Sequence, residues 1–387
     1  MVALYSIAVF LSAALLFVVQ PLAARRVLPA LGGTPGVWNT SMLFFQGVLL
    51  LGYLYAHVVT ARLGLRRQLI AHGALLGVAC LALPLGRWGL GPPPSEGEPS
   101  WWLLGTLALM VGAPFLAVSA TAPLLQRWFS RAGHERSADP YFLYAASNAG
   151  SMLGLLGYPL IVEPALALRS QALGWSAGFV LLALLVIGAG AAAVRGRFPG
   201  GSASRIAAPG TPSPNAVAPR EDSSSAVASR EGMAREGTLR ETSPRDRWRE
   251  RVLWVLLALA PSSLMLGATT FITTDVASAP LLWAIPLAIY LASFMLVFSR
   301  AGAAATRIAA RALPIAAIAL AVLLLVGATR PILVIIALHL LVLAAGALAC
   351  HGRLAALRPR PERLTEYYLL MSVGGALGGA FNALAAP

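Results

Sequence analysis

Long apolar stretches separated by short polar connections dominate the chain. A bilayer core about 30 Å thick is crossed by a helix of about 20 mostly apolar residues. Eleven stretches meet this requirement, at about 3–24, 37–59, 68–86, 101–125, 140–162, 172–194, 252–273, 279–299, 307–327, 331–350 and 366–386. The pattern predicts an all-α polytopic membrane protein. The first stretch lacks a charged segment before it and is followed by ten more, so we expect a retained helix and not a signal peptide.

Composition agrees with this class. Hydrophobic residues make up 58% of the 387 residues and charged residues 11%, against roughly 25% charged in soluble domains. Mean hydropathy is +0.75. Cys80 and Cys350 lie in or at the end of apolar stretches with no Cys or His at metal spacing, which favours small buried hydrophobes. We expect no metal site and no cofactor.

The positive charges follow the topology. All 29 cationic residues are arginine, and five of them, Arg25, Arg26, Arg87, Arg169 and Arg330, lie on odd-numbered connections. The remainder lie on even-numbered connections. Positive residues stay on the cytoplasmic side during insertion, so the amino terminus and the long segment 195–251 are expected to face the cytoplasm. The net charge of +14 therefore indicates orientation, and no nucleic-acid partner is expected.

The segment 195–251 is rich in Arg, Ser and Pro and repeats Arg-Glu. It has too little apolar surface to offset the entropy of ordering, which predicts a disordered cytoplasmic linker. The linker separates a first bundle of six helices at 1–194 from a second at 252–387. With only five predicted helices, the second bundle is expected to be shortened, and Pro387 is expected not to be the natural end.

The two halves resemble each other. Trp38 and Trp283 occupy matching places before aromatic-rich runs, "YAASNAGSMLG" matches "YYLLMSVGGALG", and this alignment pairs Tyr144 with Tyr368 and Gly150 with Gly374. Parallel repeats of six helices around a central cleft are the arrangement of major-facilitator transporters. We therefore expect two pseudo-symmetric bundles that lack a twelfth helix.

Three segments carry a family resemblance. They are "LLFVVQPLAARRVLPALGGTPGVWNTSMLFFQGVLLLGYLYAH" (15–57), "DPYFLYAASNAGSMLGLLGYPLIVEPALALRSQ" (139–171) and "APSSLMLGATTFITTDVASAPLLWAIPLAIYL" (260–291). They resemble the membrane region of bacterial spermidine-synthase-like proteins, a major-facilitator-like module usually fused to an aminopropyltransferase-like domain. The resemblance implies a bacterial inner-membrane location.

The catalytic domain of that family has no counterpart in these residues. The densest glycine cluster, "GGALGG" at 374–379, lies inside the last apolar stretch, where small residues favour close helix packing over nucleotide binding. No paired carboxylates, nucleophile with a base or metal constellation is present in the sequence. The resemblance therefore implies no catalysis by this chain.

Asn148 stands in the middle of a predicted span. Ser147, Gly150, Ser151, Gly154 and Gly157 share one helical face, which predicts an interhelical contact surface with Asn148 at its edge. Two interpretations remain open for the amide: a hydrogen bond between helices, or a ligand contact in the cleft.

Other polar residues are candidates for solute binding. Gln20 precedes Pro21, which frees backbone carbonyls for a solute or a neighbouring helix. Arg25 lies on the sparsely charged outer side, where an anionic ligand, a pairing with Glu163 or Asp275, or interfacial snorkelling would explain it. Glu163 and Asp275 are acids that a polyamine would require.

Asn39 and Gln46 share one face of the second span and complete the candidate set, and His57 further along fits an interfacial residue better than a proton relay. Two functional hypotheses follow. The first is a transporter-like module that binds or moves a small cationic or amphipathic solute such as a polyamine. The second is a non-transporting anchor or regulator of an aminopropyltransferase-like domain or subunit. Convergence of Gln20, Asn148 and Asp275 on one cavity would favour the first, and a filled core would favour the second.

Overall fold

The structure is a computed structural model of the chain and describes residues 1–31, 35–87, 89, 91–93, 99–195, 244–275, 284–299, 301–327 and 330–384. Within these ranges the chain forms helices and turns and no strand. The main helices are α1 (Val2–Leu31), α2 (Pro35–Arg62), α3 (Leu65–Cys80), α4 (Pro99–Leu107), α5 (Ala113–Phe129), α6 (Phe142–Gly157), α7 (Glu163–Ala165), α8 (Leu168–Arg195), α10 (Pro244–Asp275), α11 (Ala284–Val297), α12 (Gly302–Leu325), α13 (Ile332–Ala356) and α14 (Leu364–Leu384).

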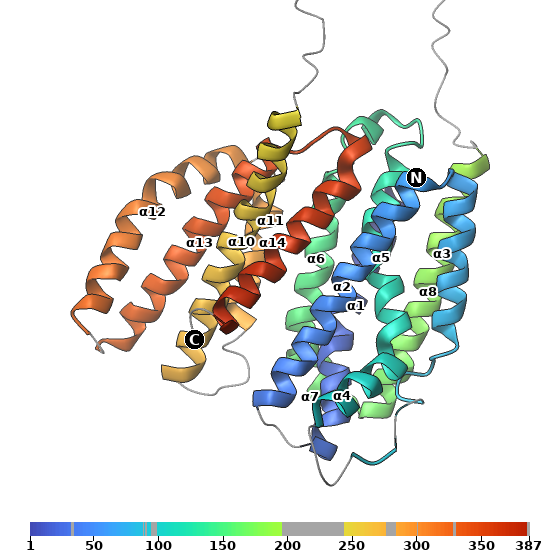
Figure 1. Cartoon of the computed structure of the whole chain (residues 1–387), viewed down its shortest axis with the longest axis horizontal. Helices are drawn as coiled ribbons and strands as arrows, with labels where there is room; N and C mark the ends of the chain where they lie inside the picture. The colour runs from blue at the N-terminus through green and yellow to red at the C-terminus, as the bar shows by residue number, and fades with distance from the viewer. Residues whose placement is uncertain are drawn as a thin grey trace, which may run out of the picture.

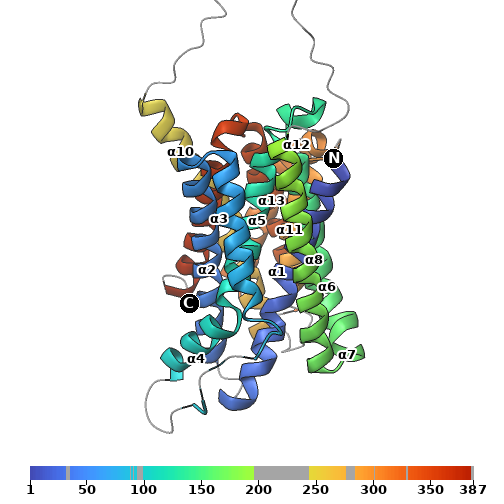
Figure 2. The same cartoon turned by 90° about the vertical axis from the view of Figure 1, so that its right-hand side faces the viewer.

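The helices form two bundles that stand side by side (Figures 1 and 2). Helices α1 to α8 make the first bundle and α10 to α14 the second. The bundles meet where α14 packs on α2 and α11 packs on α6. The predicted all-α architecture of two bundles is therefore confirmed.

Helical segments occupy all eleven predicted positions. Eight of the described helices are long and apolar enough to cross a membrane by length and composition. The predicted spans at 68–86, 279–299 and 366–386 correspond to α3, α11 and α14, which lie alongside the others (Figure 1). Helix α12 exposes Ile315 at 73% and Leu325 at 88%. Such an apolar outer surface is suited to lipid and not to water.

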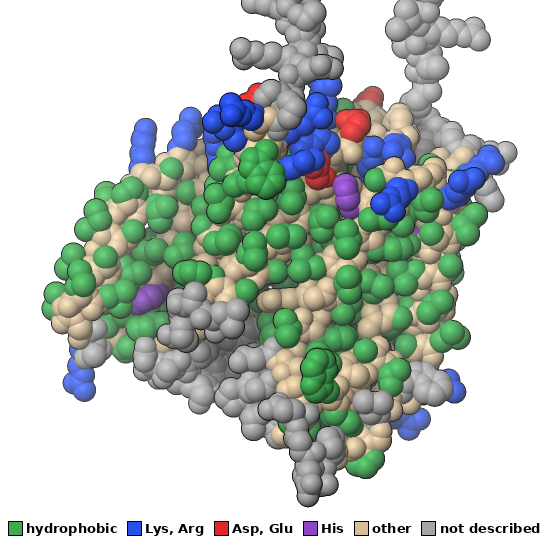
Figure 3. Space-filling view, viewed as in Figure 1, with side chains coloured by type: hydrophobic (Ala, Val, Ile, Leu, Met, Phe, Trp, Pro, Cys, Tyr) green, Lys and Arg blue, Asp and Glu red, His purple; other side chains and the backbone are tan. Residues whose placement is uncertain are grey.

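Arginines gather at one end of both bundles (Figure 3). This arginine-rich end comprises the turn 62–67, the connection 127–139, the first turns of α10 at 244–251, and the connection 353–363. The carboxyl end of α8 and the amino end of α10 lie at the same end (Figure 1). The observed placement agrees with the predicted division between even and odd connections.

Two of the continuous helical segments, α4–α5 and α6–α7, contain a π-helical turn next to a proline. Residues Ala108–Gly112 join α4 to α5 just before Pro114, and Tyr158–Val162, which contains Pro159, joins α6 to α7. Proline lacks the N–H that an α-helix needs, and a wider turn accommodates the missing bond. The sequence analysis did not predict these turns.

The predicted small-residue face of α6 packs on α1. A Cβ on Gly154 would lie 2.7 Å from the backbone oxygen of Ala14, and a Cβ on Gly150 would meet the backbone oxygen of Phe10. Ser151 between them is buried. The small-residue face of α6 is therefore confirmed as a helix contact, except at Gly157. A Cβ on Gly157 would approach only Leu153 of the same helix.

The second bundle repeats this contact. A Cβ on Gly374 of α14 would meet the backbone oxygen of Val255 on α10, and one on Gly378 would lie 2.6 Å from that of Leu259. The cluster at 374–379 therefore serves helix packing, as predicted. Gly150 and Gly374, which the internal alignment pairs, have equivalent roles in the two bundles.

The predicted linker boundary at 251 is wrong at its carboxyl side. Helix α10 begins at Pro244, so residues 244–251 are helical. Ion pairs explain the extension, because Glu250 lies 2.6 Å from Arg363 and Arg251 lies 2.6 Å from Glu366 at the start of α14. The expected disorder concerns residues 196–243, which lie outside the described residues.

Candidate functional site

Aromatic side chains fill the interface between the bundles near the arginine-rich end. The inter-bundle aromatic cluster consists of Tyr53 on α2, Tyr141 and Tyr144 at the start of α6, Tyr290, Phe294 and Phe298 at α11, and Tyr367 and Tyr368 on α14. Tyr141, Phe294, Tyr367 and Tyr368 are each at most 3% exposed. The cluster closes this end of the interface with packed rings.

Two of these rings form the centre of the cluster. Tyr144 and Tyr368 stack with centroids 5.2 Å apart and planes inclined by 13°. The ring of Tyr144 also meets the rings of Phe294 and Phe298 edge-on, at 5.1 and 5.6 Å. Each aromatic pair stabilises by about 0.5–1.5 kcal/mol beyond its buried area, so several pairs hold the bundles together here.

Hydrogen bonds between the bundles surround the rings. The Tyr368 hydroxyl donates to Oε1 of Gln126 on α5 at 2.5 Å, and the Tyr141 hydroxyl donates to the Pro359 carbonyl at 2.8 Å. Arg127 donates to the Pro361 carbonyl at 2.7 Å, and Arg358 pairs with Asp139 at 2.8 Å. The described hydrogen bonds that cross between bundles thus lie at the arginine-rich end.

A hydroxyl and histidine group extends this network between α2 and α14. The Thr365 hydroxyl lies 3.2 Å from Nδ1 of His57 and 3.1 Å from the hydroxyl of Thr60. The ring of His57 is half-buried. His57 therefore joins the two bundles. The sequence analysis had favoured a lone residue at the membrane surface.

The candidate amides Gln20 and Asn148 each bond to their own helix. Gln20 donates to the Leu16 carbonyl at 3.1 Å, and Asn148, 6% exposed, donates to the Tyr144 carbonyl at 2.8 Å. The indole of Trp175 on α8 donates to the Leu15 carbonyl at 2.8 Å. A neighbouring helix therefore bonds a carbonyl of α1, but Pro21 does not free this carbonyl, because the N–H that Pro21 lacks would have bonded Phe17.

Arg25 and Glu163 form an ion pair away from the arginine-rich end. The guanidinium lies 3.4 Å from the carboxylate, and the side chains are 45% and 39% exposed. Glu163 opens α7, which lies at the opposite end of the molecule (Figure 2). Of the explanations considered for Arg25, the structure shows the pairing with Glu163.

Gln46 of α2 lies where α2 packs on α14 between the bundles. Its side-chain amide is the group that a Cβ on Gly379 of α14 would approach, at 3.5 Å. Asn39 and Asp275 belong to helices α2 and α10, but their side chains lie outside the described part of the structure. The structure therefore brings Arg25 and Glu163 together and places Gln46 at the interface.

Two buried histidines were not singled out from the sequence. His72 on α3 lies 3.1 Å from the Thr121 hydroxyl, and His351 on α13 lies 2.7 Å from the Ser293 hydroxyl. Both are 0% exposed, and in each ring the second nitrogen has no hydrogen-bond partner among the described residues. Their position in long apolar runs gave no signal beyond the residue type itself. Among the described residues no group of three or more His, Cys, Asp or Glu could hold a metal ion.

Comparison with known proteins gives a likeness of fold. No protein-family model matches the chain, and no curated protein is significantly similar to it. The chain is similar to the solved structure of the xylose transporter XylE from E. coli in a partially occluded inward-open conformation. The identity is 15%, the TM-score is 0.42, and the match covers 99% of this chain and 97% of that chain. A likeness at this level assigns no ligand and no activity.

Proposed function

We propose that the chain is a transporter-like module of a bacterial inner membrane that binds and moves a small cationic or amphipathic solute such as a polyamine. In this proposal the bundles at 1–194 and 252–387 rock against each other, and the arginine-rich end and the linker face the cytoplasm. No catalysis and no cofactor are assigned to these residues.

The observation that carries the proposal is the nature of the contact between the bundles. The glycine contacts within each bundle bring backbones together, whereas Tyr144, Tyr368 and their neighbours join the bundles through side chains. Side-chain rings and hydrogen bonds can separate without unfolding a helix. Their concentration at one end supports a state closed toward that end.

The chemistry of the interface supports a cationic solute. Tyr53, Tyr144, Tyr290 and Tyr368 offer ring faces on which an ammonium group can rest once the rings separate. At the opposite end Glu163 holds Arg25 at 3.4 Å in a half-exposed pair. A solute ammonium can exchange with that guanidinium because the pair is loose and accessible.

A second candidate function is a membrane anchor or regulator of an aminopropyltransferase-like partner. It is favoured by the hydrogen bonds of Gln20 and Asn148, which each bond to their own helix and do not point to a shared site. Under this alternative the bundles stay closed and nothing crosses.

Uptake by proteoliposomes tests the two candidates against each other. Vesicles holding the purified chain should accumulate or exchange labelled spermidine above empty vesicles. Glu163→Gln should lower uptake, whereas Arg353→Gln, a change of an exposed arginine at the other end, should not. Folded protein that gives no uptake would exclude the transport proposal. The anchor alternative then predicts that aminopropyltransferase activity co-sediments with the tagged chain in membranes.

A further inference from the structure

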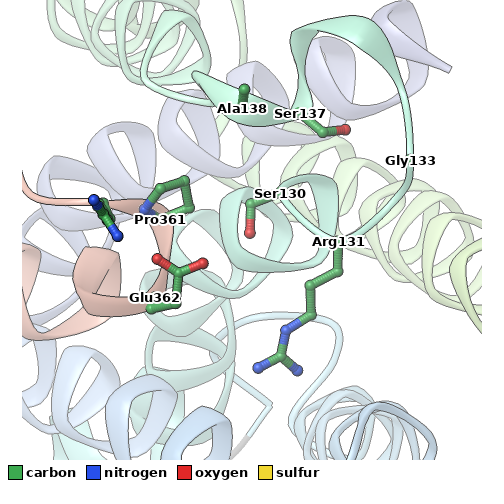
Figure 4. A pocket seen from close by; sticks show the side chains of 8 residues that line it. Ser130, Arg131, Gly133, Ser137, Ala138, Pro361 and Glu362 are labelled. Carbon is green, nitrogen blue, oxygen red and sulfur yellow. The ribbon is translucent and has the colours of Figure 1, made fainter. Parts of the chain in front are cut away.

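A cavity of about 570 Å³ lies at the arginine-rich end (Figure 4). It is built from both bundles. Ser130, Arg131 and Ser137 come from the connection between α5 and α6, and Arg360, Pro361 and Glu362 come from the connection between α13 and α14. Any group that fills the cavity therefore touches two parts of the chain that belong to different bundles.

The charges that line the cavity are unpaired. Arg131, Arg360 and Glu362 are exposed, and their side chains form no hydrogen bond or ion pair with a residue that the structure describes. Their neighbours differ in this respect, because Arg358 pairs with Asp139 and Arg363 pairs with Glu250 and Glu366. The cavity is thus lined by two available guanidinium groups, one from each bundle.

A third guanidinium lies next to these. Arg127 is 8% exposed, and its described hydrogen bonds go to the Pro361 carbonyl at 2.7 Å and to the Ser130 hydroxyl at 3.5 Å. Both acceptors are uncharged residues that line the cavity. No carboxylate lies within ion-pair distance of Arg127, and the nearby Glu362 offsets only part of its charge, so Arg127 adds to the positive potential of the cavity.

Ser137 supplies a further donor. Its hydroxyl accepts from the backbone N–H of His134 at 3.1 Å and donates to no described residue, so its proton is available. Guanidinium groups and a hydroxyl are the donors that bind phosphate oxygens. The lining side chains Arg131, Arg360 and Glu362 together carry one net positive charge, and the adjoining Arg127 adds a second, so the cavity favours an anion.

We propose that this cavity binds the singly charged phosphate of a phosphodiester, with its oxygens between Arg131 and Arg360 and within reach of Ser137. The headgroup of an anionic phospholipid and a soluble phosphodiester share this chemistry. The inference does not depend on transport, and it would stand if the chain moved no solute.

Binding in this cavity favours the closed state of the arginine-rich end. The two guanidinium groups belong to different bundles, so the ligand meets both only while the bundles are together. A ligand that binds one state better shifts the population toward it. The anion therefore acts as a clamp at this end.

The general excess of arginine at this end offers a matched control. A second cavity of about 490 Å³ is lined by Gly64, Leu65, Arg66, Arg67 and Val194, all from the first bundle. It carries two arginines like the first cavity, but it joins no second bundle. An effect of charge alone would be the same at both cavities.

Thermal unfolding of the full chain tests the proposal. Glycerophosphoglycerol is added to protein in an uncharged detergent, and in parallel the protein is placed in nanodiscs of phosphatidylcholine with or without one third phosphatidylglycerol. The Tm of the wild type should rise with glycerophosphoglycerol in detergent, with phosphatidylglycerol in nanodiscs, or with both. Stabilisation by the soluble probe identifies a soluble ligand, and stabilisation in the nanodisc arm alone identifies a lipid headgroup.

Variants separate the clamp from general charge. R131Q/R360Q should bind the effective probe about tenfold more weakly or worse, because two charge-assisted hydrogen-bond donors are lost. R66Q/R67Q should bind it like the wild type, and E362Q should bind it more tightly. Absence of stabilisation in both arms, or an equal loss in R66Q/R67Q, would overturn the proposal.

Discussion

Tyr144 and Tyr368 stack face to face across the two bundles, with ring centroids 5.2 Å apart. They are also the two tyrosines that the internal alignment of the sequence pairs. Residues that are equivalent in two repeats meet when they lie next to the axis that relates the repeats. The stack therefore places the axis of the internal repeat at the interface between the bundles.

The stack should couple the two tyrosines energetically. A double-mutant cycle of Tyr144→Ala and Tyr368→Ala should give a coupling free energy of about 0.5–1.5 kcal/mol in detergent unfolding experiments. Tyr144→Ala with Tyr5→Ala is the control, because Tyr5 packs against Phe129 inside the first bundle. Additive effects of the two stacked tyrosines would contradict a direct contact.

The hydroxyl of Tyr368 should matter separately from its ring. Tyr368→Phe leaves the buried Oε1 of Gln126 without its donor and should lower the free energy of unfolding by about 1–3 kcal/mol. Tyr55→Phe is the matched control, since the buried Tyr55 hydroxyl has no partner among the described residues. Thermal or chemical unfolding monitored by circular dichroism measures both. A cost in Tyr55→Phe as large as in Tyr368→Phe would argue against this account.

The glycine contacts should be intolerant of one added carbon. Gly378→Ala places a Cβ 2.6 Å from the Leu259 carbonyl, which requires the helices to shift and should cost about 1–3 kcal/mol. Gly375→Ala meets nothing within 4 Å and should be neutral or stabilising, because alanine favours the helix. The comparison uses the free energy of unfolding in one detergent. Equal effects of the two substitutions would show that α14 does not pack on α10 in this way.

Among the arginines of the connection 353–363, Arg363 should be the one whose replacement lowers the free energy of unfolding most. It bonds to Glu366 at 2.8 Å and Glu250 at 2.6 Å, and its guanidinium lies 4.9 Å from the centre of the Trp254 ring. Burial acts to lower the pKa of Arg363, but the hydrogen bonds that its guanidinium donates to both carboxylates raise the pKa overall, so Arg363 stays charged. Arg363→Gln should cost about 1–3 kcal/mol.

Arg353→Gln provides the control for that substitution. Arg353 lies at the end of α13 in the same region, is exposed, and forms no ion pair with a described residue. Its replacement should change the free energy of unfolding by less than about 0.5 kcal/mol. Similar costs for the two arginines would mean that the pairs with Glu250 and Glu366 contribute little.

Much of the fold could be predicted because it depends on local pattern. The length of the apolar stretches located the helices. The spacing of Gly150, Ser151 and Gly154 identified a helix-contact face, but it did not identify the helix that packs on this face. The internal alignment also paired Tyr144 with Tyr368. The alignment could not predict that these tyrosines touch, because their contact depends on how the two bundles are rotated against each other.

The candidate site was harder to predict because polar side chains can bond locally. The sequence predicted partners outside the helix for Asn148 and Gln20, but each side chain bonds a carbonyl of its own helix. Gln126, which does bond across the bundles, lies near the end of α5 and gave no pattern of its own. The start of α10 at Pro244 was missed because ion pairs with α14, distant in sequence, stabilise that turn.

Rocking of the bundles is the central claim, and paired distance measurements test it most directly. Cys80 and Cys350 are replaced by alanine, and spin labels are attached at exposed positions across the arginine-rich end, Ala61 and Ser299, or across the opposite end, Leu166 and Val326. Double electron–electron resonance then gives the distance distribution of each labelled pair in lipid, with and without spermidine. We expect reciprocal changes, in which one end opens as the other closes. Distances at both ends that stay single and unchanged by the solute would contradict the claim.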